Sequence, residues 1–294
     1  MSREHLFGPL AIPTVHRFLL SVSHAAQSLS VFAVRRFAAL CVLALATTLW
    51  ATTAHAQLSI DRGELELRMS GDAQVRAGVL TVRNTTGERL QAQVALEDWD
   101  RGPDGGNRFH TYQSLSHSCG DALRVFPLTL NLGPGEAQPV RIEYTGAERS
   151  AECTSLVVVQ QAPGSGPKKA GVNVTMRMAL KVYALPVTSS AGGEITDIVV
   201  TRAATATDST RVLVTYRNEG NRHVKATGRL EIRQEDNSLI TSIDLPAVYA
   251  LGGATMQVRA ALPALAPGRY VLLAIYDYGG NDLAAGQLQY EVAK

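Results

Sequence analysis

The chain has 294 residues, of which 46% are hydrophobic and 18% charged. This composition excludes an intrinsically disordered protein, because the apolar fraction is large enough to bury a core. The 28 basic and 26 acidic side chains give a formal net charge of +2, which is not the concentrated basic charge of nucleic-acid-binding proteins. Nucleic acid is therefore not an expected partner.

The N-terminal segment has the order of residues that export signals share. An apolar, uncharged stretch at 37–51 follows Arg35 and Arg36 and precedes the small-x-small triplet Ala54-His55-Ala56. This order is typical of a secretory signal peptide. The alternative is a membrane anchor, which needs about 20 uninterrupted apolar residues. We predict an N-terminal extension and signal peptide at 1–56, cleavage after Ala56, a periplasmic location, and no membrane insertion after cleavage.

The charge changes when that segment is set aside. Residues 1–56 hold four basic and one acidic side chain, so residues 57–294 carry 24 basic against 25 acidic side chains. The positive excess therefore belongs to the targeting segment. A start of translation further along, for example at Val34, would leave a short n-region before the apolar stretch.

Two cysteines remain after residue 56, Cys119 and Cys153. Two cysteines in an oxidising compartment favour a disulfide. The alternative is a copper or zinc site formed by Cys119 with His110 and His117. We predict the Cys119–Cys153 disulfide, and neither a metal site nor a cofactor.

From residue 57 onward, apolar residues alternate at period two between turns rich in glycine, proline and asparagine. The strands predicted before a small-residue stretch at 188–193 are Glu64–Met69, Gly78–Arg83, Gln91–Trp99, Val125–Asn131, Gln138–Tyr144, Ser155–Gln160 and Val172–Tyr183. The strands predicted after it are Glu194–Val200, Arg211–Arg217, Lys225–Arg233, Leu239–Ile243, Thr255–Leu262, Gly268–Asp277 and Leu283–Val292. Seven short strands in roughly 130 residues are typical of an immunoglobulin-type sandwich. We predict an all-β fold of two tandem immunoglobulin-like β-sandwiches, at 57–188 and 192–294.

The sequence contains no arrangement of residues typical of catalysis. It lacks the G-x-S-x-G, H-E-x-x-H, phosphate-loop and dinucleotide motifs. We therefore expect a protein that is not an enzyme and has no catalytic residues. The acidic stretch Asp98, Asp100, Asp104 with Asn107 does not have the spacing of an EF-hand, and we expect a solvated hairpin there.

The segment Val172–Tyr183 has six apolar residues in strict alternation. Twelve residues at about 3.3 Å each make a strand of about 40 Å, which is longer than a typical strand. All six apolar side chains would fill the core of their own sandwich in one interpretation. In the other, part of the strand lies at an edge and offers backbone groups and apolar side chains to a partner.

Five segments in chain order resemble the first domain of the periplasmic pilus assembly chaperones, the PapD-like family. They read IDRGELEL, GVLTVRNTTGE, LRVFPLTLNLGPGEAQPVRIEY, SLVVVQQAP and MALKVYALP. The positions that carry the family pattern are Pro127, Leu132, Pro134, Gly135, Gln138, Val140, Arg141 and Lys181. The resemblance covers most of 57–186 and thins in the second half of the chain.

The resemblance implies a chaperone that caps pilus-type subunits by donor-strand complementation through the edge strand 172–183. Val172, Val174 and Met176 would be the donated side chains, and Lys181 would hold the C-terminal carboxylate of the subunit. The family pairs this lysine with an arginine in the first strand, where this sequence has Glu64, and Arg62 is the candidate replacement. An outer-membrane usher is a further candidate partner. The alternative function is a structural or adhesive extracytoplasmic module that keeps this strand for itself.

Overall fold

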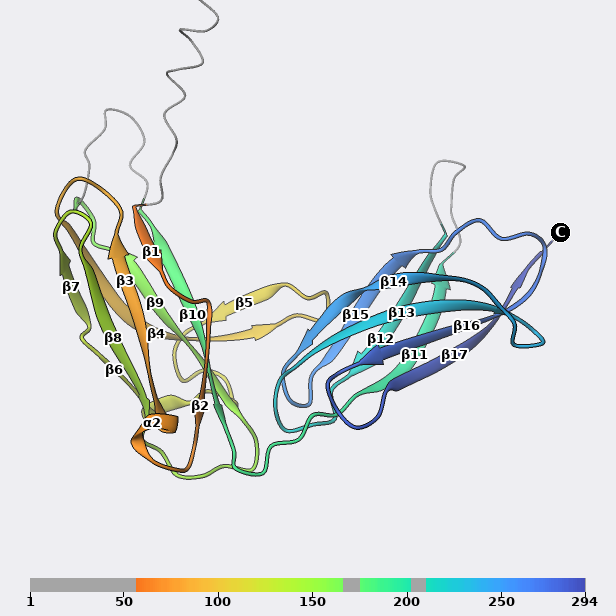
Figure 1. Cartoon of the computed structure of the whole chain (residues 1–294), viewed down its shortest axis with the longest axis horizontal. Helices are drawn as coiled ribbons and strands as arrows, with labels where there is room; N and C mark the ends of the chain where they lie inside the picture. Colours follow the sequence, from red (N-terminus) through yellow and green to blue (C-terminus); the bar gives the residue numbers. More distant parts are fainter. Residues whose placement is uncertain (1–56, 166–174, 202–209, 294) are drawn as a thin grey trace, which may run out of the picture. The chain divides into compact units, whose positions relative to one another are not determined.

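The computed structural model describes residues 57–165, 175–201 and 210–293. Strands make up most of these residues (Figure 1). All of them belong to one compact unit, His55–Lys294. The prediction of an all-β fold with tandem sandwiches is confirmed, whereas the predicted domain boundaries at 188 and 192 stay predictions.

The first ten strands form two sheets, which appear in Figure 1 from orange to green. One sheet has the order β1 (Leu58–Ile60), β3 (Ala77–Asn84), β8 (Ala137–Tyr144), β6 (Leu123–Phe126). The other has the order β2 (Glu64–Arg68), β10 (Arg177–Leu185), β9 (Cys153–Gln161), β4 (Leu90–Arg101), β5 (Asn107–His110), and β7 (Thr129–Leu132) also pairs with β4. Their inward side chains form one core that includes Leu80, Val140, Val159 and Leu180.

Two connections in this sandwich move the chain from one sheet to the other. β1 pairs with β3 in the first sheet, and β2 pairs with β10 in the second, so the chain changes sheets at 61–63. The predicted single strand Val125–Asn131 is wrong, because β6 pairs with β8 and β7 pairs with β4. Pro127, which lacks an N–H for a ladder, lies between these two strands.

Four short elements were not predicted: β1, β5, a helix of one turn, and the 3-10 helix η1 (Gly120–Ala122). β1 and β5 are only three and four residues long, too short for an alternating pattern to stand out. Between β2 and β3 lies the one-turn helix α2 (Ala73–Arg76), and the Asp72 carboxylate accepts from the Gln74 and Val75 N–H groups at its N-terminus. A four-residue helix has no periodicity to detect.

The last seven strands form two further sheets. One has the order β11 (Glu194–Thr201), β12 (Arg211–Arg217), β15 (Thr255–Ala261), and the other β14 (Leu239–Ala250), β13 (Val224–Gln234), β16 (Gly268–Asp277), β17 (Ala284–Val292). The prediction that the strand from Leu239 ends at Ile243 is wrong, because β14 continues to Ala250. Pro246 is tolerated there because the ladder with β13 shifts register around it, leaving a bulge where no N–H is required.

Strand β9 is buried on both faces. Residues Cys153–Val159 are all buried, since one face fills the main core and the other packs in a smaller cluster. That cluster consists of Trp99, Leu156, Val158, Tyr183 and Leu185, with Leu251 packed against it. The continuous apolar run in the sequence, rather than an alternating one, is what two buried faces require.

Candidate functional site

The candidate site begins at the free edge of strand β10. Its antiparallel ladder with β9 runs from Arg177↔Gln160 to Ala184↔Cys153. Its parallel ladder with β2 starts only at Lys181↔Glu64. The first four residues of β10 therefore have a strand on one side and, within the described residues, none on the other.

The direction of the backbone groups shows what this edge offers. The Lys181 N–H donates to the Gly63 carbonyl on the β2 side (3.0 Å), whereas the Met176 carbonyl accepts from the Gln161 N–H on the β9 side (2.9 Å). Because successive residues of a strand alternate between its edges, the N–H and C=O groups of Arg177 and Ala179 face the β2 side. They lie before the first β2 residue, at the open edge.

The predicted alternating face of this strand divides into two parts. Leu180 and Val182 are fully buried in the core of their own sandwich, and Met178 packs against it. Met176 is partly exposed and lies just before β10. Val172 and Val174 lie outside the described residues. The core interpretation therefore holds for the second half of the strand, and the roles of Val172, Val174 and Met176 stay predictions.

Lys181 already has a carboxylate partner within the chain. Its Nζ lies 3.2 Å from Oε1 of Glu64, the residue opposite it in the ladder. The same ammonium lies 4.9 Å from the ring centroid of Trp99, where a cation–π contact is favourable. The Lys181 side chain is 20% exposed and that of Glu64 57%. The predicted anchor lysine thus has an ion-pair partner, Glu64, within its own chain.

Arg62 is not brought to this lysine. It precedes β2, in the segment where the chain changes sheets, and its Nη2 lies 3.4 Å from Oδ2 of Asp61. Both side chains are well exposed, so this pair is solvated and weak. The interpretation of Arg62 as a partner of Lys181 finds no support in this geometry.

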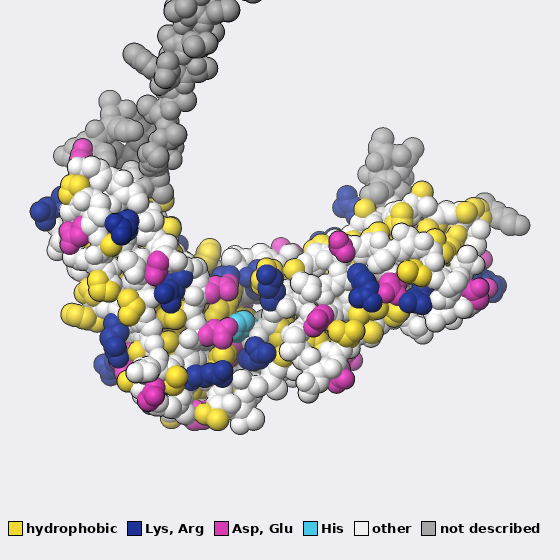
Figure 2. Space-filling view, in the orientation of Figure 1, with side chains coloured by type: hydrophobic (Ala, Val, Ile, Leu, Met, Phe, Trp, Pro, Cys, Tyr) yellow, Lys and Arg dark blue, Asp and Glu magenta, His cyan; other side chains and the backbone are white. Residues whose placement is uncertain are grey.

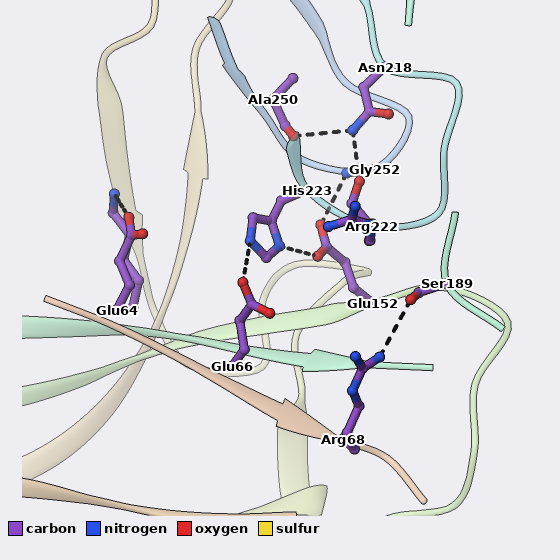
Figure 3. A network of polar contacts seen from close by, with 11 residues as sticks. Glu64, Glu66, Arg68, Glu152, Ser189, Asn218, Arg222, His223, Ala250 and Gly252 are labelled. Carbon is purple, nitrogen blue, oxygen red and sulfur yellow. Dashed lines mark hydrogen bonds and ion pairs between the residues drawn. The ribbon is translucent and has the colours of Figure 1, made fainter. Parts of the chain in front are cut away.

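A polar network centred on His223 includes Glu66 and Glu152 (Figure 3). The His223 Nδ1 lies 2.8 Å from Oε2 of Glu152, and its Nε2 lies 3.3 Å from Oε1 of Glu66. The imidazole stacks on the Tyr183 ring with a centroid distance of 3.8 Å. The Glu152 side chain is only 4% exposed and also accepts from the Gly252 N–H at 3.1 Å. The network thereby joins the first ten strands to the last seven.

His223, Glu66 and Tyr183 line a cavity of about 300 Å³. Its walls include the carboxylates of Glu64 and Glu66, the rings of Trp99 and Tyr249, and several basic side chains. Burial, with smaller contributions from the neighbouring Glu64 and Glu152, raises the pKa of Tyr183, so this phenol stays neutral. Figure 2 shows dark-blue and magenta side chains interspersed over the surface, without a large field of one sign.

The hairpin β4–β5 positions one of the basic side chains of the cavity, Arg101. Asp98 lies in β4 at the start of this hairpin and is fully buried. Its carboxylate accepts hydrogen bonds from the Ser114 N–H (2.9 Å), the Leu115 N–H (3.1 Å) and the Ser118 Oγ (2.7 Å). The predicted hairpin is therefore present, but the prediction that it is solvated is wrong for Asp98. This carboxylate is used as an internal acceptor for the following loop.

The cysteines pair as predicted. Cys119 and Cys153 form a disulfide with a Cα–Cα distance of 4.9 Å, which ties the loop before β6 to the start of β9. The two histidines of the alternative metal site have other partners. The His110 Nε2 lies 3.2 Å from Oδ1 of Asp100, and the His117 Nε2 lies 3.2 Å from the Trp99 carbonyl oxygen. Within the described residues no group of three or more His, Cys, Asp or Glu side chains is placed to hold a metal ion.

Sequence reasoning missed Trp99, Arg101 and His223. Trp99 and Arg101 come from β4, whereas His223 lies just before β13, more than a hundred positions away. No spacing rule connects such distant residues. The one available signal was a tryptophan at the polar end of a predicted strand, since a buried ring of that size usually packs against a partner surface.

The fold and this geometry define an immunoglobulin-like protein with one incomplete sheet edge beside a charged, aromatic cavity. In the part of the chain that the structure describes, no helix is long and apolar enough to cross a membrane. No protein-family model matches the chain, and no curated protein matches it either.

Solved structures to which the chain is similar include three complexes of chaperones with their subunits. A chain of the chaperone–tip adhesin complex of CFA/I fimbriae biogenesis is 10% identical, with 81% of this chain and 100% of that chain covered and a TM-score of 0.49. The CsuC–CsuE pre-assembly complex of Csu pili from Acinetobacter baumannii gives 12% identity, 79% and 98% coverage and a TM-score of 0.44. The Salmonella enterica SafA pilin–SafB chaperone complex gives 13% identity, coverage of 82% of this chain and 99% of that chain, and a TM-score of 0.41. Because these TM-scores are below 0.5, the fold is assigned from the strand pairing of this chain and not from the likeness.

Proposed function

We propose that this protein is an exported, periplasmic chaperone that binds pilus-type subunits along the open edge of β10. The observation that carries the proposal is the late start of the β10–β2 ladder at Lys181↔Glu64. It leaves the backbone groups of Arg177 and Ala179 directed at the side where β2 has not yet begun. An incomplete sandwich that lacks one strand would gain a ladder there, with main-chain hydrogen bonds providing affinity.

The sequence motifs of 57–186 support the same function, because they resemble the PapD-like chaperones. In that family the donated side chains correspond by position to Val172, Val174 and Met176, which continue upstream of the open edge. Removal of 1–56 would accompany export, and an outer-membrane usher is the expected second partner. Binding of this kind needs neither a catalytic group nor a cofactor.

Ala179→Pro tests the proposal at the open edge. Proline removes the N–H that faces the partner side, but it leaves the ladder with β9 intact, and edge strands tolerate it. Pilus-type subunits of the same organism would be co-expressed with the chain and recovered on an affinity tag. We expect a one-to-one complex with the wild type and with Ala179→Ser, which keeps the N–H, and a loss of at least tenfold with Ala179→Pro.

Two results would contradict the chaperone proposal. One is equal recovery of the subunit by the proline and serine variants. The other comes from hydrogen exchange on the free protein: protection of the Ala179 amide comparable to that in β9 would show that the chain keeps this edge for itself, as the structural or adhesive alternative requires.

A further inference from the structure

Cations and aromatic rings alternate in a series of contacts that starts at Lys181 and continues along the wall of the cavity. We call this set the cation–aromatic row, and its members in order are Lys181, Trp99, Arg101, Tyr249 and Lys225. The Lys181 Nζ and the Arg101 Cζ lie 4.9 and 5.9 Å from the Trp99 centroid. The Arg101 Cζ and the Lys225 Nζ lie 5.4 and 5.5 Å from the Tyr249 centroid. All four contacts are within the range of a cation–π interaction.

The charges of the row are not balanced within the chain. Lys181 is paired with Glu64, and the second carboxylate of the cavity, Glu66, lies 3.3 Å from the Nε2 of His223. Arg101 donates to a neutral acceptor, the Gly105 carbonyl, at 2.9 Å. Among the described residues no carboxylate forms an ion pair with Arg101 or Lys225. Two cations fixed against one ring therefore have no counter-charge.

A cation held in this way attracts an anion more strongly than a freely solvated one. Arg101 is only partly exposed, and in partly desolvated surroundings the attraction between opposite charges exceeds that in bulk water. Its guanidinium keeps donors beyond the one that the Gly105 carbonyl uses, and a planar fork of donors matches a carboxylate. The row is thus suited to a planar monoanion.

The position of the row indicates where that anion comes from. The row starts at Lys181, which is also the residue where the open edge of β10 ends and β2 takes over. A client strand laid along Arg177–Leu180 cannot continue past Glu64 in the same edge position. Whichever end of the client strand reaches Lys181 must leave the edge there, beside the Trp99 ring that Lys181 contacts.

We propose that Arg101 and Lys225, which both contact the Tyr249 ring and line the cavity, bind a carboxylate of the client polypeptide. The inference rests on the proposed function and moves the anion site away from Lys181, whose charge Glu64 already neutralises. The carboxylate belongs either to the C-terminus of the client or to an Asp or Glu side chain near the end of its bound strand.

The test uses Trp99 as a reporter. The chain has two tryptophans, Trp50 and Trp99, so Trp50→Phe in the full chain makes the emission specific for the row. Three acetylated peptides of alternating valine and threonine would be titrated: one with a free C-terminus, one amidated, and one amidated with a final aspartate. We expect a peptide carboxylate to bind about tenfold more tightly than the neutral peptide at low salt, with a smaller ratio at high salt.

Variants assign the charge to its residues. Arg101→Gln and Lys225→Gln are each expected to remove most of the preference for the carboxylate, whereas Lys181→Gln leaves it within about twofold. Arg101→Lys keeps a cation and should keep part of the preference. Arg108→Gln is the matched control, because this arginine of the same hairpin is already paired with Asp100. An unchanged circular dichroism spectrum establishes that each variant is folded.

The outcomes separate the two proposals. A preference for the free C-terminus alone, or for the aspartate as well, identifies the source of the carboxylate. Equal binding of all three peptides, or loss of the preference in Lys181→Gln only, overturns the anion site and leaves edge binding intact. If no peptide binds and no subunit is recovered on co-expression, the chaperone function and the anion site both fall.

Discussion

Asp100 accepts hydrogen bonds from two basic side chains of the facing strand. The Arg108 Nε and Nη2 donate to its two oxygens at 2.8 and 2.7 Å, and the His110 Nε2 lies 3.2 Å from Oδ1. The guanidinium of Arg108, more than the imidazole, lowers the pKa of the Asp100 carboxyl below its ordinary value. The pair joins facing residues of the β4–β5 hairpin.

The first prediction concerns the pH dependence of this pair. Because the pKa of Asp100 is lower in the folded than in the unfolded chain, the pair stabilises the fold at pH values above the ordinary aspartate pKa. That stabilisation is lost as the pH falls through the lowered value. A carbon NMR titration should place the Asp100 midpoint below about 3.9, and Arg108→Gln should raise it. An unchanged midpoint in Arg108→Gln would contradict the assigned cause.

At the scale of the element, β10 combines two roles along nine residues. From Lys181 onward it has β2 and β9 on its two sides, and Leu180 and Val182, the residues before and after Lys181, fill the core. Its first half has only β9. The change occurs within one residue, at Lys181, since β2 begins there.

This division gives a second prediction. Leu180→Ala removes a fully buried side chain and should lower the free energy of unfolding by about 3 kcal/mol, because it leaves a cavity in a packed core. Met176→Ala removes a partly exposed side chain outside the core and should cost less than about 1 kcal/mol. Urea unfolding followed by circular dichroism measures both. Equal costs would show that the two halves of the strand are packed alike.

Much of the strand pattern follows from the sequence because alternation depends on local residues. β3, β8 and β12 lie within a residue or two of their predicted bounds. The sheet changes at 61–63 and at Pro127 could not be predicted, since which sheet a short strand joins is decided by distant partners. The same limit applies to the site. Lys181 was found from a motif, but its neutralisation by Glu64 depends on a parallel register across 117 residues.

At the scale of the whole molecule, two separate apolar cores are connected by few contacts. One core belongs to the first ten strands and the other to the last seven. Leu251 packs on the small cluster around Trp99, and Glu152 receives His223 and the Gly252 N–H. Glu152 is therefore a buried polar residue of this connection, to which the hydrogen bond from the Gln257 N–H to the Pro103 carbonyl also belongs.

A third prediction follows for Glu152→Ala. The substitution leaves the Gly252 N–H and the His223 Nδ1 without their carboxylate partner, which should cost about 2–4 kcal/mol. We expect scanning calorimetry to show two resolved transitions in the variant and stronger coupling of the two cores in the wild type. Glu88→Ala, at an exposed site in the first sandwich, is the control and should leave the trace unchanged. One undivided transition in Glu152→Ala would show that the cores are coupled by other contacts.

The change of sheets at 61–63 has a consequence for the reach of the molecule. If β2 started one residue earlier, it would pair with one more residue of β10. If β2 started one residue later, one more residue of β10 would be left unpaired on that side. The number of rungs available to a guest strand is therefore set by the length of a three-residue crossover, far in sequence from β10 itself. Insertions or deletions at this crossover would change the length of the guest strand that can pair with β10, while the side chains of β10 stay the same.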